Sequence, residues 1–163
     1  MASTLSIRQA VLTGWLLCGV LDISAAFVQA WTRAGRPPSA VLKGIASALW
    51  GRAAIDGGAG MAAAGLIMHF AVALTATLVF YVLSRRIALL RTAPLLVVGA
   101  LYGTAVFAAM NYGTLPLLSW VRSLYLGTPP RWPGSMDLPM LIIHIFCVGL
   151  PIVWGVRRAP LPR

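Results

Sequence analysis

Apolar residues dominate four long runs of the sequence, and basic and polar residues gather in the stretches between them. A helix of about 20 apolar residues, rising 1.5 Å per residue, crosses the roughly 30 Å hydrocarbon layer of a bilayer. The pattern therefore predicts four transmembrane helices, over residues 9–31, 61–84, 94–120 and 138–156. Residues 157–163 would follow as a short tail, disordered from Ala159 to Arg163.

The segment between the first two predicted spans has a different pattern. Val41, Ile45 and Leu49 recur at helical spacing, and the charged Lys43 falls on another face. This spacing predicts an amphipathic helix over residues 40–55 that lies in the membrane interface. The predicted fold is an all-α, integral membrane four-helix bundle in a single transmembrane domain, with this interfacial helix between spans 1 and 2.

Composition supports a membrane protein over a soluble one. Of the 163 residues, 60% are hydrophobic and only 10% are charged, with a net charge of +10; soluble domains carry about 25% charged residues. The basic residues lie mainly beside the apolar runs, where lipid headgroups and insertion topology favour them. We therefore expect the lipid bilayer as a partner and no nucleic acid.

Charge placement also predicts an orientation. Several arginines lie close to span ends, and the positive-inside rule favours the cytoplasm for that side: Arg85, Arg86, Arg91, Arg157 and Arg158. Both termini are then cytoplasmic. The first apolar run is too long for a signal peptide and is read as an uncleaved span. Aromatic residues expected in the belt at the other surface are Trp31, Trp120 and Trp132.

Small residues and prolines indicate how the spans pack. Gly99 and Gly103 form a GxxxG pair, which predicts a contact face either inside the bundle or between two copies. Pro116 and Pro151 fall late in the third and fourth spans, where each leaves a carbonyl unpaired and predicts a kink.

Each predicted span carries one conspicuous polar residue, and these are Asp22, His69, Asn111 and His144. Counted from the span ends at the helical rise, all four lie roughly 9 to 14 Å from the same membrane surface. A lone polar group in hydrocarbon is costly, so these side chains should face the bundle interior. We expect Asp22 to contact one or both histidines, with Asn111 as a bridge.

Three interpretations of this polar layer remain open. It could be structural, through interhelical hydrogen bonds. It could respond to protons or ions, because a carboxylate and imidazoles exchange protons near neutral pH. It could also hold a metal or haem between His69 and His144, although two histidines are a weak signal, and we expect neither a metal nor a cofactor.

Catalytic patterns are not evident in the sequence. It has no HExxH motif, no phosphate-binding glycine loop and no pair of acidic residues, so we expect no enzyme and no catalytic residues. Cys18 and Cys147 lie within apolar runs and are interpreted as small buried apolar residues.

Several short motifs resemble the YagU-like family of small, uncharacterised bacterial inner-membrane proteins. They are Gly19-Val20-Leu21-Asp22-Ile23, Leu42-Lys43-Gly44-Ile45-Ala46, Gly57-Gly58 ahead of Gly65-Leu66-Ile67-Met68-His69-Phe70, Leu101-Tyr102-Gly103, Met110-Asn111 and Pro116-Leu117. The resemblance implies a four-span protein of the bacterial inner membrane and no particular activity. His144 lies outside these motifs.

The function expected from the sequence is that of an accessory or homo-oligomeric membrane component with a polar intramembrane site. The alternative is a small transporter or channel for protons, ions or a small solute. A single four-span chain has little room for a pore, so transport would require a homo-oligomer or a larger complex.

Overall fold

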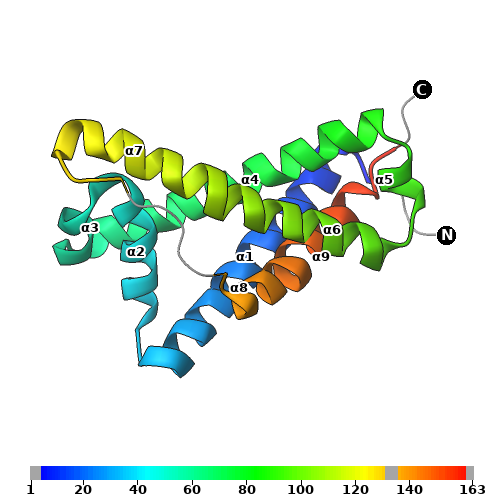
Figure 1. Ribbon diagram of the computed structural model, residues 1–163. Coiled ribbons are helices and arrows are strands. Elements are labelled where there is room, and N and C mark those ends of the chain that lie inside the picture. Colours follow the sequence, from blue (N-terminus) through cyan, green and yellow to red (C-terminus); the bar gives the residue numbers. More distant parts are fainter. Residues whose placement is uncertain (1–4, 131–135, 161–163) are drawn as a thin grey trace.

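The computed structural model describes residues 5–130 and 136–160, and these residues form helices without strands (Figure 1). The first two spans are α1 (Ile7–Ala34) and α4 (Ala59–Arg86). The third runs from Leu95 to Leu126 through α6 (Leu95–Ala108), the π-helical segment η1 (Ala109–Thr114) and α7 (Leu115–Leu126). The fourth comprises α8 (Leu138–Ile143), the π-helical segment η2 (His144–Gly149) and α9 (Leu150–Val156).

All four of these helices are long and apolar enough to cross a membrane, so the all-α, four-span prediction is confirmed. Large apolar side chains are exposed along them to an extent that a soluble surface would not tolerate, such as Ile67 at 70% and Leu101 at 68%. Three spans are longer than predicted, and the third continues six residues beyond the predicted end at residue 120, to Leu126.

The predicted interfacial helix over residues 40–55 is two helices, α2 (Pro38–Trp50) and α3 (Arg52–Asp56). Gly51 separates them with a backbone φ of 56°, a left-handed conformation that glycine adopts without strain. The sequence-based prediction missed this break and also missed the short helix α5 (Leu89–Thr92).

Helix α2 packs against α4 and α7 at the loop end of the bundle (Figure 1). Gly65 of α4 lies directly against the backbone of Leu42, where a larger residue would not fit. From α7, the buried Arg122 donates to the carbonyl of Ser47 at 3.0 Å, and the Tyr125 hydroxyl donates to the carbonyl of Leu49. These contacts attach α2 to the bundle.

Glycines form the tightest contacts between spans at the other end. Gly14 of α1 meets Gly155 of α9, and Gly99 and Gly103 of α6 meet Gly149 at the end of η2. The predicted GxxxG contact face is therefore an internal one. Around these contacts, a core of buried side chains fills the bundle, and it includes Phe80, Val98, Ile152, Val153 and Val156.

The first and last described segments meet on the side opposite the loops that contain α2 and α3. The Leu5 amide donates to the carbonyl of Arg158 at 3.0 Å. The prediction of a disordered tail is wrong at Ala159, which is 3% exposed. Residues 161–163 and Trp132, which was assigned to the aromatic belt, lie outside the described residues. Trp31 and Trp120 are both more than half exposed, at 61% and 52%.

The glycine contact between the third and fourth spans can be tested with Gly149→Ala. The added Cβ would lie 2.6 Å from the backbone nitrogen of Gly103, so the two helices must separate. Overpacking of this kind costs about 1–3 kcal/mol. We expect the thermal unfolding midpoint in detergent, followed by circular dichroism, to fall by several degrees.

The matched control is Gly60→Ala near the start of α4, where an added Cβ would meet no atom within 4 Å. There the replacement should leave the midpoint unchanged or raise it slightly, since alanine favours the helix. Equal midpoints for Gly149→Ala and the parent protein would contradict the proposed role of this contact.

Candidate intramembrane binding site

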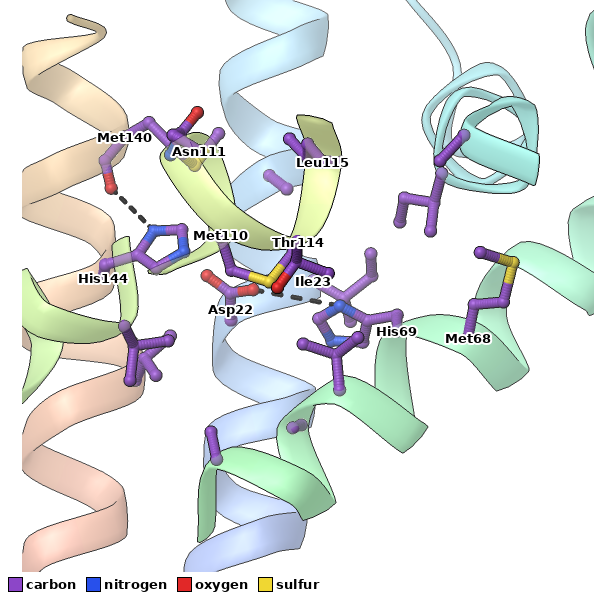
Figure 2. A pocket seen from close by; sticks show the side chains of 18 of the residues that line it. Asp22, Ile23, Met68, His69, Met110, Asn111, Thr114, Leu115, Met140 and His144 are labelled. Carbon is purple, nitrogen blue, oxygen red and sulfur yellow. Dashed lines mark hydrogen bonds and ion pairs between the residues drawn. The ribbon is translucent and has the colours of Figure 1, made fainter. Parts of the chain in front are cut away.

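A cavity of about 400 Å³ lies among the four spans and α2. Most of its lining is apolar, and α2 contributes Val41, Ile45 and Ala48. Polar side chains on its walls come from all four spans: Asp22, His69, Asn111, Thr114 and His144 (Figure 2). Asp137, directly before the fourth span, also lines it. The structure therefore brings the four residues of the predicted polar layer to one cavity.

Asp22 and His69 face each other across the cavity (Figure 2). The Asp22 Oδ2 and His69 Nδ1 atoms are 3.9 Å apart, and the side chains are 17% and 11% exposed. The His69 Nε2 atom lies 2.9 Å from the carbonyl oxygen of Gly19, one turn before Asp22 on α1. Because a carbonyl oxygen only accepts, Nε2 donates in this contact, and Nδ1 is the ring nitrogen that faces the carboxylate.

Asn111 and His144 make their hydrogen bonds within their own helices. The Asn111 amide donates to the carbonyl of Phe107 at 2.9 Å, and His144 Nδ1 donates to the carbonyl of Met140 at 2.9 Å. No hydrogen bond joins Asn111 to Asp22 among the described residues, so the predicted bridge is not formed. These local bonds leave His144 Nε2 available on the cavity side of the ring (Figure 2).

Both of these residues belong to π-helical segments. Asn111 lies within η1, and His144 opens η2. Each segment ends two residues before a proline, Pro116 or Pro151, which cannot donate the usual helical hydrogen bond. The wider π turn accommodates the missing donor, and such turns are frequent at functional sites. The two prolines were predicted from the sequence to interrupt regular helix geometry. In the structure, the interruptions are the π-helical segments beside the cavity.

The cavity wall contains a hydrogen-bond acceptor without a partner among the described residues. The Asp22 Oδ1 atom is buried and has no hydrogen-bond partner among the described residues. The terminal torsion of an aspartate is soft, so a small rotation presents this oxygen to the cavity. His144 Nε2 lies on the cavity side of its ring, free of the local bond that Nδ1 makes. Asp22 and Asp137 are also two of only three acidic residues in the chain.

Sequence analysis missed Asp137 as a cavity residue. It precedes α8, where its carboxylate accepts from the Met140 amide at 3.3 Å, and it pairs with Arg33 of α1 at 3.1 Å. With 40% of its side chain exposed, Asp137 marks where the cavity reaches the surface at the loop end. Its position directly before an apolar run is an N-cap signal that the sequence contains.

The opposite end of the cavity is closed. Cys18, Ala73 and Val148 line it and also belong to the buried core, so they form its floor. Cys18 is buried, as expected, whereas Cys147 is only partly buried. Within the part of the chain that the structure describes, no group of three or more His, Cys, Asp or Glu side chains is placed to hold a metal ion.

No protein-family model, curated protein or solved structure matches this chain. The resemblance to YagU-like proteins therefore stays a prediction.

A cysteine introduced at Thr114 tests whether water reaches the cavity. In a background with both native cysteines replaced by alanine, we expect Thr114→Cys to react with a membrane-impermeant thiol reagent, because Thr114 lines the cavity. Thr77→Cys is the control, since Thr77 of α4 is fully buried in the core. Labelling is measured by the shift in mass of the intact protein. Equal labelling of the two variants would contradict an open cavity above a closed floor.

Proposed function

We propose that this chain is a non-enzymatic, multi-pass protein of the bacterial inner membrane, related to the YagU-like proteins, with both termini in the cytoplasm. In this proposal it binds a small, mainly apolar molecule that carries a cationic or hydrogen-bond-donating group. It acts as an accessory or homo-oligomeric membrane component. One observation carries the proposal: an apolar cavity holds a buried carboxylate oxygen, on Asp22, that has no partner among the described residues.

The lining supports this class of ligand. A volume of about 400 Å³ lies within the range of small-molecule sites, which combine apolar walls with a few convergent polar groups. A buried acceptor without a partner costs about 1–3 kcal/mol, and a ligand N–H group would remove that cost. The methionines Met68, Met110 and Met140 on the walls adapt to different apolar shapes.

Charge distribution points to the same ligand. The chain has a net charge of +10, yet two of its three carboxylates line this cavity. Asp137 is paired with Arg33, and Asp22 has only His69 at 3.9 Å, beyond hydrogen-bond range. A protonated amine at Asp22 would form a charge-assisted hydrogen bond in surroundings that exclude most water.

Alkylammonium binding tests this proposal. In lipid nanodiscs, we expect hexylammonium to bind more tightly than hexanol, because both fill the apolar walls but only the ammonium pairs with Asp22. Asp22→Asn should weaken hexylammonium binding about tenfold, the loss of one charge-assisted hydrogen bond, and change hexanol binding little. Isothermal titration calorimetry, corrected with empty nanodiscs, provides the affinities.

Asp56→Asn is the matched control for this experiment. Asp56 ends α3 at the same end of the bundle, but it pairs with Arg52 at 3.3 Å and does not line the cavity. Its replacement should leave both affinities unchanged. If hexylammonium bound the parent protein and Asp22→Asn equally, the acidic site would be ruled out as its binding position.

A second candidate function is transport of the same ligand or of protons. It is favoured by the two π-helical segments, η1 and η2, which contribute Asn111 and His144 to the cavity walls and end two residues before prolines. Helices interrupted at the membrane midplane are common in transporters, where they form substrate sites and move.

Proteoliposome flux separates the two candidates. A transporter should produce uptake of hexylammonium, or acidification of the lumen under a proton gradient, that is reduced at least about tenfold in Asp22→Asn. An accessory protein should bind hexylammonium and give the same flux as empty liposomes. Equal flux from the parent protein and Asp22→Asn, above that of empty liposomes, would exclude transport through this site.

A further inference from the structure

Two arginines meet at the end of the bundle opposite the cavity. Arg91 lies on α5, and Arg157 directly follows α9, beside it (Figure 1). Each donates to the backbone of the other's segment: Arg91 Nη2 to the carbonyl of Ala159 at 2.6 Å, and Arg157 Nε to the carbonyl of Leu90 at 2.9 Å. These reciprocal bonds fix the two guanidinium groups near each other.

Each guanidinium group keeps a donor nitrogen that no described residue accepts from. Arg91 Nη1 and Arg157 Nη2 are buried and have no hydrogen-bond partner among the described residues. Burial, together with the positive charge of Arg91, lowers the pKa of the Arg157 guanidinium. Two positively charged guanidinium groups are therefore held close together, with part of their surface shielded from water. This arrangement is unfavourable unless an anion lies beside them.

No side-chain carboxylate of this chain is available to neutralise the pair. The sequence contains only three acidic residues. Each is placed elsewhere: Asp22 lies against His69, Asp56 pairs with Arg52, and Asp137 pairs with Arg33. Further arginines at this end of the bundle add positive charge. Arg158 stacks 3.5 Å above the ring of Trp154, and Arg85 and Arg86 end α4.

We propose that Arg91 and Arg157 form a binding site for a phosphate group, supplied by an anionic lipid headgroup or by free phosphate. A guanidinium fork matches the oxygens of a phosphate, and two forks can hold one phosphate from two sides. Each arginine keeps further N–H groups beside its backbone bond, so one anion can pair with both without releasing α5 from the end of α9. This site is independent of the cavity.

Native mass spectrometry of the whole protein, extracted in mild detergent from liposomes of phosphatidylglycerol and phosphatidylcholine, tests the proposal. The parent protein should retain phosphatidylglycerol selectively. Arg91→Gln/Arg157→Gln should retain about tenfold less. Arg85→Gln/Arg86→Gln is the matched control, because it removes the same charge at the same end but neither of the unpartnered donors; it should retain nearly as much as the parent protein.

A further double variant separates bound phosphate from a diffuse positive field and from misfolding. Arg91→Lys/Arg157→Lys keeps both charges and loses the fork, so phosphatidylglycerol retention should again fall about tenfold. Retention equal to the parent protein would overturn the site. If Arg91→Gln/Arg157→Gln failed to fold, as judged by circular dichroism, the lysine variant would still decide the question.

A titration identifies the source of the phosphate group. The protein is placed in nanodiscs of phosphatidylcholine alone, inorganic phosphate is added, and its binding is followed by ³¹P NMR. Inorganic phosphate that binds the parent protein but not the lysine variant, without selective lipid retention, indicates a free anion. Lipid retention that excess phosphate displaces indicates the headgroup. Absence of both kinds of binding would overturn the proposal, as would equal loss in the Arg85→Gln/Arg86→Gln control.

Discussion

The close glycine contact between α6 and the end of η2 determines where this bundle can be hollow. With Gly99, Gly103 and Gly149 at the contact, the third and fourth spans approach until their backbones touch, and Gly14 and Gly155 do the same for α1 and α9. Helices that meet so closely at one end leave more space where larger side chains and π turns follow. The cavity lies at that wider end. Below it lies the buried core, which is closely packed because the glycines let the helices approach each other.

The same end of the bundle holds the polar groups, because hydrocarbon tolerates them only against partners or in a cavity. His69 uses a backbone carbonyl of α1, and Asn111 and His144 use carbonyls of their own helices. Asp22 accepts from none of these side chains. Its unmet oxygen is the observation that favours the proposed binding site over interhelical hydrogen bonding that serves structure alone.

Much of this arrangement could be predicted from the sequence, since hydrophobic run length identifies spans and helical rise sets depth. The depth count brought Asp22, His69, Asn111 and His144 to one level, and all four line one cavity. Hydrogen-bond partners could not be predicted in this way, because depth does not identify the acceptor. Asn111 and His144 donate to carbonyls four residues earlier in their own helices. The break at Gly51 and the contribution of Asp137 depended on tertiary packing that periodicity does not encode.

A cavity closed on one side restricts what the protein can do without a change of shape. For a ligand to pass through, α1 and α9 would have to part at the floor, where Gly14 and Gly155 place backbone against backbone. Close packing of this kind holds helices together in lipid, so its loss would need compensation from elsewhere. A ligand that only binds needs no such opening and removes the cost of the unpaired Asp22 oxygen. The proposed binding therefore needs only the arrangement observed, whereas transport requires a second arrangement in which the glycine contacts are open.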